Sequence, residues 1–318
     1  MHSVEICAGA GGQALGLEQA GFEHVELVEL DAPACATLRC NRPEWRVIEG
    51  DVRNYHVGHL VGVDLIAGGV PCPPFSHAGK QLGADDERDL FPEALRLIEE
   101  ARPVALMLEN VRGLLDPRFE AYRADLLAQL KALGYEAHWK LLHASDFGVP
   151  QLRPRSILVG LQKSVAAHFD WPEPGKTETP SVGACLHDLM AANGWAGADA
   201  WRDRANAIGP TLVGGSKKHG GPDLGPTRAR AAWANLGVDG RGLADLAPHE
   251  AFTGDPRLTV RMAARIQGFP DGWELSGKKT AAYRQVGNAF PPPVARAVGQ
   301  QIAAAIEMAA SSRVKKRA

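Results

Sequence analysis

The chain has 318 residues, of which 45% are hydrophobic and 23% charged, and its formal net charge at pH 7 is −2. This is the composition of a soluble globular protein with one large domain or two unequal ones, and the overall charge does not by itself indicate a nucleic-acid partner. No apolar stretch approaches the roughly 18 residues that span a bilayer, and the start of the chain lacks the pattern of a secretion signal. We therefore expect a cytoplasmic protein without membrane contact.

The cysteines are odd in number and scattered, with no CxxC pair. This pattern argues against a disulfide framework and against a zinc site, so we expect reduced thiols and no metal. The five positions are Cys7, Cys35, Cys40, Cys72 and Cys185.

Short β-branched runs alternate with helical patterns through the first half of the chain. We expect strands at residues 4–7, 25–30, 45–48, 63–67, 104–108, 137–142 and 156–160. We expect helices at residues 13–20, 33–39, 90–101 and 118–133. This alternation predicts an α/β fold with a doubly wound, mostly parallel sheet.

The composition changes after this sheet. Between about residues 172 and 270 the chain is rich in Gly, Pro, Trp and Asp, with weak periodicity and many turn pairs. Regular helix resumes at 292–310, where an apolar face would pack back on the first domain. We therefore predict one domain of residues 1–165 plus 277–318 and a second, smaller, irregular domain of residues 166–276.

One stretch of the second domain is locally basic. Residues 202–230 contain six Lys or Arg and two Asp, a net charge of +4. A solvated loop surface and a nucleic-acid contact explain this excess equally well.

A strand, a glycine turn and a helix start open the chain. Residues 4–7 are followed by Ala8-Gly9-Ala10-Gly11-Gly12 and then by helical sequence. Glycines let the backbone approach a ligand closely, and a helix N-terminus offers free N–H groups. Alone, such a turn also fits a nicotinamide enzyme, a flavoprotein or simple tight packing.

Acidic side chains close the next two strands. Glu29 lies 20 residues after Gly9, where a carboxylate can accept hydrogen bonds from ribose hydroxyls, and Asp51 could accept one from an exocyclic amine. A single acid at a strand end is more often a helix cap or a solvated turn. In register with the glycine turn, the two acids favour a nucleoside ligand.

Two further strand ends carry reactive side chains. Cys72 follows the apolar run 63–69, and Glu109 with Asn110 closes the run 104–108. Because the carboxyl ends of parallel strands meet in one crevice, we read Cys72 as a nucleophile and Glu109 as its acid partner. Taken singly, a cysteine beside prolines is most often a buried hydrophobe, and Glu-Asn at a strand end is also typical of a turn and cap.

In this order along nearly the whole chain, the motifs resemble those of the cytosine-5 DNA methyltransferases of restriction-modification type. The matching segments are 8–12, Glu29, Asp51, 71–76, 88–91, 109–111, 146–155, 258–270 and 285–289. The chain departs from the family at Cys7, where an aromatic residue is usual, at Pro73 in place of Gln and at Met262 in place of Glu. Adenine stacking would then come from elsewhere, such as Leu90 and Phe91.

The resemblance implies a reaction and a cofactor. A Cys72 thiolate would add to C6 of cytosine, Glu109 would protonate N3 and Asn110 would hold its loop. Arg155 would lie near O2, and Arg153 or Arg155 would favour the thiolate. The cofactor would be S-adenosyl-L-methionine, bound by Ala8, Gly9, Ala10, Gly11, Gly12, Glu29, Asp51, Val52, Gly69, Pro71, Leu90, Asn288 and Ala289.

The resemblance also implies duplex DNA as the partner. The target cytosine must leave the duplex for C6 to be reached, and residues 77–86 would close over it. The domain 1–165 plus 277–318 would be catalytic, residues 166–276 would recognise the target, and we expect a monomer associated with the nucleoid through DNA. The expected DNA contacts are Ser76, Lys80, Gln81, Lys217, Lys218, Arg228 and Arg230.

Three alternatives compete with this interpretation. A relative of the same fold could methylate cytosine in RNA, although the basic insert of the second domain fits duplex DNA better. A non-catalytic DNA-binding homologue would not need Cys72, Glu109 and Arg155, which are all present. A nicotinamide dehydrogenase is disfavoured because no histidine or lysine base follows the glycine turn in a matching context.

Overall fold

The protein is described from a computed structural model, which covers residues 1–71, 89–175, 178–214 and 223–315. Seven strands of this part of the chain form one sheet in the order β3-β2-β1-β4-β5-β7-β6. Their bounds are β1 His2–Ile6, β2 Glu23–Glu29, β3 Val47–Glu49, β4 Leu65–Gly69, β5 Ala105–Val111, β6 Tyr135–His143 and β7 Pro154–Gln162. Neighbouring strands from β3 to β5 are parallel, whereas β7 runs antiparallel to both β5 and β6. The predicted α/β fold with a mostly parallel sheet is confirmed.

Helices connect the strands and cover them. Their bounds are α1 Gly12–Gln19, α2 Ala32–Asn41, α3 Phe91–Ala101, α4 Glu120–Ala132, α5 Lys163–Ala166, α6 Val182–Ala191, α7 Ala198–Arg204, α8 Thr227–Asn235, α9 Val260–Gln267, α10 Lys279–Asn288 and α11 Pro292–Lys315. The four helices expected in the first half correspond to α1–α4. No helix among the described residues is long and apolar enough to cross a membrane.

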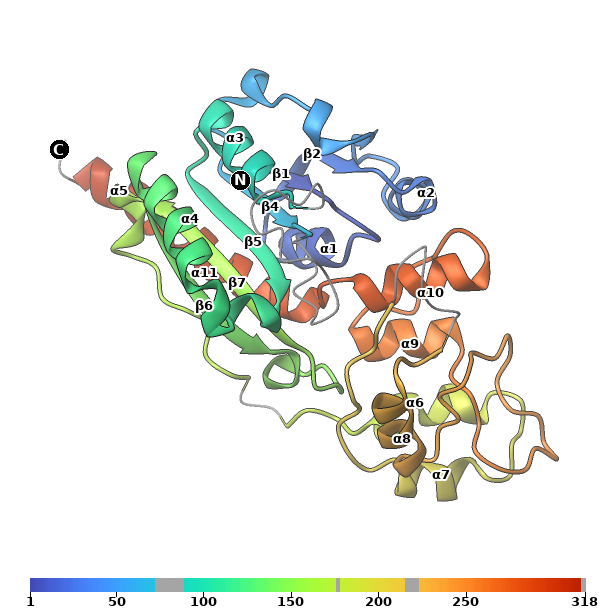
Figure 1. Ribbon diagram of the computed structural model, residues 1–318. Coiled ribbons are helices and arrows are strands. Elements are labelled where there is room, and N and C mark those ends of the chain that lie inside the picture. Colours follow the sequence, from blue (N-terminus) through green and yellow to red (C-terminus); the bar gives the residue numbers. More distant parts are fainter. Residues whose placement is uncertain (72–88, 176–177, 215–222, 316–318) are drawn as a thin grey trace.

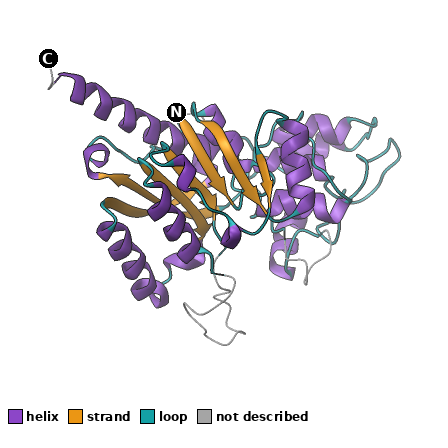
Figure 2. Cartoon of the chain, turned by 90° about the horizontal axis from the view of Figure 1, so that it is seen from above, coloured by secondary structure: helices purple, strands orange, loops and turns teal. Residues whose placement is uncertain are grey.

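Alternating side chains of the central strands feed two separate cores. In β5, Leu106 and Leu108 belong to the core that α3 and α4 cover, whereas Ala105 and Met107 belong to the core that α1 and α11 cover. Because side chains of a strand point to opposite faces in turn, an all-apolar strand needs cover on both sides. Figure 2 shows the helices on either side of the strands, and α11 packs along α1.

The regular elements described between β7 and α10 are the short helices α5–α9, which loops connect. Figure 1 shows α6, α7, α8 and α9 gathered at one side of the molecule, away from most of the sheet. A single apolar core continues from Leu38 on α2 and Trp45 through Trp273 into this region, and the rings of Trp45 and Trp273 lie 6.2 Å apart. This continuous packing fixes the helical region relative to the glycine turn.

Met262 caps helix α9. It stands at a position where the family that the chain resembles has Glu. The Thr259 hydroxyl accepts a hydrogen bond from the Met262 N–H at 3.2 Å, and the Met262 sulfur accepts one from the Thr259 N–H at 3.4 Å. This reciprocal arrangement is a capping box in which sulfur replaces the usual carboxylate. The departure from the family pattern therefore preserves the start of the helix.

Candidate active site

The turn after β1 uses positive φ angles that favour glycine. Cys7, Gly9 and Gly11 have φ of 52°, 55° and 82°. A Cβ on Gly11 would lie 2.7 Å from Cδ2 of Leu38, and the Trp273 indole N–H donates to Ala10 O at 3.1 Å. Packing from α2 and from Trp273 therefore holds the turn that the sequence assigns to a ligand.

A cavity of about 1060 Å³ opens at the carboxyl edge of the parallel strands. Most of the described residues predicted for the site line it: Ala8, Gly9, Ala10, Gly12, Glu29, Asp51, Val52, Gly69, Pro71, Leu90, Glu109, Asn110, Arg155, Asn288 and Ala289. Gly11 and Arg153 lie outside this lining. The sequence-predicted residues therefore converge on one pocket at the edge where α/β proteins bind ligands.

Glu29 at the end of β2 is oriented by two backbone amides. Its Oε2 accepts from the Gly9 N–H and its Oε1 from the Asp31 N–H, both at 2.7 Å. Each oxygen keeps a second lone pair for a hydroxyl donor. The carboxylate thus faces the cavity in a fixed orientation, as a ribose contact would require.

Asp51 both caps a short helix and lines the cavity. Its Oδ1 accepts from the Arg53 N–H at 3.0 Å, and its Oδ2 pairs with the Arg53 guanidinium at 2.9 Å. The backbone N–H of Arg53, followed by its side chain, lowers the pKa of Asp51, although partial burial opposes this. Asp51 therefore has both features expected of it: it caps a helix, as a lone acid would, and it lines the cavity, as a nucleoside contact would.

Sequence reasoning missed two acceptors in the cavity wall. Both carboxyl oxygens of Glu5 and Oε1 of Gln13 are buried without a hydrogen-bond partner. Burial, with a smaller contribution from the Glu29 charge, raises the pKa of Glu5 well above its usual range. Polar atoms buried in this way need a donor, which a ligand rich in N–H or O–H groups would provide.

Other cavity residues were not among the predicted site residues. They are Cys7, Val28, Leu30, Asp31, Ala34, Gly50, Arg53, Val70, Val111, Gly113, Thr211, Leu212, Val213, Gly214, Arg284, Gln285, Gly287 and Phe290. Val111, Gln285 and Gly287 lie within segments that match the family motifs, so the motifs already indicated them. The group at 211–214 comes from the segment between α7 and α8, where nothing local marks it, so the helical region completes the pocket.

Glu109 and Arg155 form a buried ion pair in the cavity wall. Nε of Arg155 lies 2.7 Å from Oε1 of Glu109. Burial raises the pKa of Glu109, and the charges of Arg155 and then Arg153 oppose that rise. A carboxyl group with a raised pKa carries a proton at higher pH than usual, which suits a general acid.

Asn110 links this pair to the chain segment that leads to Cys72. Its Nδ2 donates to Val70 O at 2.7 Å, and its backbone carbonyl accepts from the Ser156 hydroxyl at 3.1 Å. The β4–β5 register pairs Gly69 with Glu109. The backbone just before Cys72 is therefore fixed beside the Glu109 carboxylate.

Arg153 is fully buried and engages backbone carbonyls only. Its guanidinium donates to Leu212 O, Gly287 O and Ala289 O at 2.7, 2.8 and 2.9 Å. Burial, followed by the charge of Arg155, lowers the pKa of Arg153 well below its usual range. These contacts favour a positioning role for Arg153 over the catalytic role predicted from the sequence.

Several predicted residues fall outside the described part of the chain: Cys72, Ser76, Lys80, Gln81, Lys217, Lys218 and the segment 77–86. Arg228 lies exposed on α8, and Arg230, half-buried, has its Nη1 4.0 Å from Oδ2 of Asp223. Within the described ranges, no group of three or more His, Cys, Asp and Glu side chains could hold a metal ion.

Three of the described cysteines, Cys7, Cys35 and Cys185, are poor candidates for a reactive thiol. Burial raises the pKa of the Cys7 thiol, in the cavity wall, to about 12, with a further contribution from Glu29. Burial also raises the pKa values of Cys35 and Cys185 to about 11. Since the thiolate is the nucleophile, none of these three would be active near neutral pH.

The expected aromatic substitute for stacking is only partly available. Leu90 lines the cavity, but Phe91 is fully buried beneath it and contacts the rings of Tyr122 and Trp139, each at 6.1 Å. The suggestion that Phe91 stacks on adenine is therefore wrong, because its ring is part of the core under α3. Leu90 and Val52 supply the apolar surface there.

Solved structures share the fold. The methyltransferase EhMeth of Entamoeba histolytica superimposes with a TM-score of 0.67 at 13% identity, covering 97% of this chain and 98% of that one. A DNMT2 mutant of Spodoptera frugiperda gives 0.64 at 17% identity, covering 95% and 99%. At these identities the likeness establishes the fold alone.

Sequence relatives and a family model are far more specific. Type II methyltransferase M.NaeI of Lentzea aerocolonigenes is 61% identical over 320 residues, which cover 98% of this chain and 77% of that protein. Type II methyltransferase M.NgoMIV of Neisseria gonorrhoeae is 58% identical over 308 residues, covering 96% and 98%. The model for C-5 cytosine-specific DNA methylase matches residues 1–304. The chain therefore belongs to the C-5 cytosine-specific DNA methylases, as a DNA cytosine-5 methyltransferase of restriction-modification type.

Proposed function

We propose that the protein methylates C5 of a cytosine flipped out of duplex DNA, through a covalent bond between Cys72 and C6, with S-adenosyl-L-methionine as the methyl donor. When bound, this cofactor would supply an electrophilic methyl group on its sulfonium sulfur. The family assignment implies the methyl transfer, and the arrangement of Glu109, Asn110 and Arg155 supports the covalent route.

The cavity residues fit such a cofactor. The Glu29 carboxylate would accept hydrogen bonds from the ribose hydroxyls, and Asp51 and Val52 would contact the base. The buried, unpartnered oxygens of Glu5 and Gln13 would accept from an ammonium group of the amino-acid part. Each of these acceptors would then face a ligand that is rich in donors.

Cys72 would act as the nucleophile. Its thiolate would add to C6 of cytosine, the electron pair of the C5–C6 double bond would make C5 nucleophilic, and C5 would then take the methyl group. Loss of the C5 proton to water and departure of the sulfur would restore the aromatic base. Pro71, which directly precedes Cys72 in the sequence, lines the cavity.

Glu109 and Arg155 would stabilise the charge that this addition creates. Negative charge develops on N3 during the attack, and a protonated Glu109 would donate a proton there. Arg155 would pair with O2 of the base. The observation that carries the proposal is that the Glu109–Arg155 pair is buried in the cavity wall, while Asn110 holds the Val70 carbonyl two residues before Cys72.

The test begins with the unknown target sequence. Bisulfite sequencing of plasmid DNA from cells that express the chain would give the methylated position. A duplex with 5-fluorocytosine at that position should then trap a protein–DNA conjugate, because fluorine at C5 blocks release of the base.

The wild type should form a conjugate at residue 72 that survives denaturation, and Cys72→Ser should form none. Cys40→Ser, which alters an exposed cysteine on α2, should behave as the wild type. A conjugate that forms equally well with Cys72→Ser, or methylation of transfer RNA in preference to duplex DNA, would overturn the proposal.

A further inference from the structure

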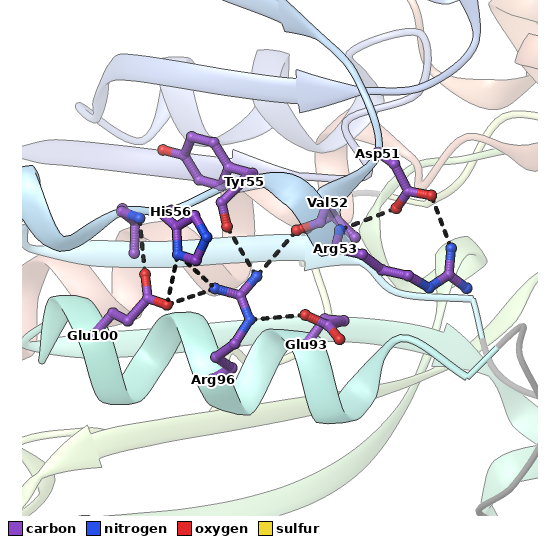
Figure 3. Close-up of polar contacts among 9 residues, drawn as sticks. Asp51, Val52, Arg53, Tyr55, His56, Glu93, Arg96 and Glu100 are labelled. Carbon is purple, nitrogen blue, oxygen red and sulfur yellow. Dashed lines mark hydrogen bonds and ion pairs between the residues drawn. The ribbon is translucent and has the colours of Figure 1, made fainter.

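One arginine outside the cavity lining controls the shape of its nucleoside end. Arg96 lies on α3, and its Nη2 donates to Tyr55 O at 2.9 Å and to Val52 O at 3.2 Å. These two carbonyls belong to the segment that follows β3. Figure 3 shows the guanidinium between this segment and its own helix.

The orientation of Arg96 is set by two glutamates one turn away on either side. Nε donates to Oε2 of Glu93 at 2.8 Å, and Nη1 donates to Oε1 of Glu100 at 2.5 Å. These are the i,i+3 and i,i+4 spacings at which helix side chains meet. With Nε and Nη1 occupied in this way, Nη2 is directed at the two carbonyls. A planar guanidinium can make all of these hydrogen bonds in fixed directions, whereas an ammonium group cannot.

Glu100 contacts the same segment. Its Oε2 accepts from the Val57 N–H at 3.0 Å, and its Oε1 accepts from Nδ1 of His56 at 3.1 Å. Three backbone groups of residues 52–57 are therefore held by one helix face. The side chains of Arg96 and Glu100 are 30% and 25% exposed, so water competes only partly for these contacts.

The held segment, residues 52–57, overlaps a wall of the cavity at Val52 and Arg53. Gly50, Asp51, Val52 and Arg53 all line it, whereas Arg96 does not. Leu90, at the start of α3, lines the same end and donates its N–H to Pro71 O at 3.2 Å. Arg96 thus fastens together the two segments, 50–53 and the start of α3, between which a nucleoside would lie.

We infer that Arg96 is a positioning residue for cofactor binding, which acts through the carbonyls of Val52 and Tyr55 on the segment that contacts the adenine end of the cofactor. This inference rests on the proposed function. Because hydrogen bonds from a charged donor are strong, their partial transmission to the binding wall would change cofactor affinity by about tenfold.

The test compares Arg96→Met, which has no donors, with Arg96→Lys, which keeps the charge but not the fork. Calorimetry would give the Kd for S-adenosylhomocysteine and for 5′-methylthioadenosine, which lacks the amino-acid part. In Arg96→Met both Kd values should rise about tenfold and by the same factor, because the affected wall contacts the shared nucleoside. Arg96→Lys should give a smaller rise, and kcat at saturating cofactor should stay within about threefold of the wild type.

Arg204→Met is the matched control. Arg204 on α7 also joins a carboxylate and a carbonyl, with Nη1 2.7 Å from Oδ1 of Asp255 and Nη2 2.6 Å from Ala234 O, and none of these residues lines the cavity. This variant should lower the melting temperature but leave the Kd for S-adenosylhomocysteine within twofold.

The outcomes separate the inference from the proposed function. If the wild type fails to bind S-adenosylhomocysteine, the proposed function fails. If the wild type binds and Arg96→Met loses only thermal stability, with Kd unchanged, Arg96 is merely structural and the inference is wrong. Should Arg96→Met fail to fold, Glu100→Gln serves instead, and wild-type Kd values in both Glu100→Gln and Arg96→Lys would contradict the inference.

Discussion

Arginines occupy both the carboxyl edge of the sheet and the helical region around α8, but the two regions hold them differently. At the sheet edge, Arg155 has a side chain only 12% exposed and is paired with Glu109, which is 10% exposed. On α8, Arg228 is exposed to solvent. A charge withdrawn from water acts strongly on one fixed partner, whereas an exposed charge acts weakly and in a salt-dependent way on whatever approaches.

The two regions can therefore act on different parts of the reaction. At the sheet edge the pKa of Glu109 is raised, and its Oε1 lies 2.7 Å from Nε of Arg155 in a fixed orientation. A proton transfer needs these properties. The helical region offers solvated positive charge, which suits contact with a phosphate backbone. Changes at the sheet edge should therefore alter kcat, and changes on α8 should alter DNA affinity.

Replacing the acid should have the largest effect. In Glu109→Gln, kcat should fall by about 10²–10⁴, because an amide cannot deliver a proton to N3. Methyl incorporation into duplex DNA under single-turnover conditions measures this. Glu136→Gln, on an exposed position of β6, is the control and should retain wild-type activity. A loss of less than tenfold in Glu109→Gln would remove Glu109 from the chemistry.

Removing the charge beside Glu109 should alter both the rate and its dependence on pH. In the wild type, kcat should fall as the pH rises through the raised pKa of Glu109, because the proton to be donated is lost. The positive charge of Arg155 favours the carboxylate, so Arg155→Met should raise the pKa of Glu109 further. The decline of kcat with rising pH, which forms the alkaline limb of the pH profile, should then move to higher pH. The loss of a charge partner for O2 should also lower kcat by about 10²–10³. A limb that stays in place or moves to lower pH would contradict the assignment.

Removing an exposed charge should have the smallest effect. Arg228→Gln should leave kcat at saturating DNA unchanged, weaken binding to all duplex sequences alike, and lower the slope of log Kd against log salt by about one. Titration at several salt concentrations measures this. Arg230→Gln should change the slope less, since Arg230 is half-buried and close to Asp223. Equal slopes in Arg228→Gln and the wild type would place Arg228 outside the DNA interface.

Local patterns in the sequence predicted much of the fold. Alternating apolar runs and helical periodicity gave each strand of the sheet and helices α1–α4 to within a few residues, because both signals depend on side chains close together in the chain. The apolar run 104–108 predicted a strand, and the structure buries it on both faces as β5. The short helices α6–α9 were not predicted, because each has at most 10 residues and so gives only a weak helical periodicity.

From the sequence alone, polar side chains at the ends of strands are predicted to meet at one edge of a parallel sheet, and most of them line one cavity there. Their contacts, by contrast, follow from the tertiary structure. Arg153 and Arg155 stand two positions apart, yet one meets three carbonyls from distant segments and the other meets Glu109. Likewise, the contact of Arg96 with Val52 spans 44 positions. Such contacts depend on how whole layers pack, and the local sequence carries no information about the distance between segments that only packing brings together.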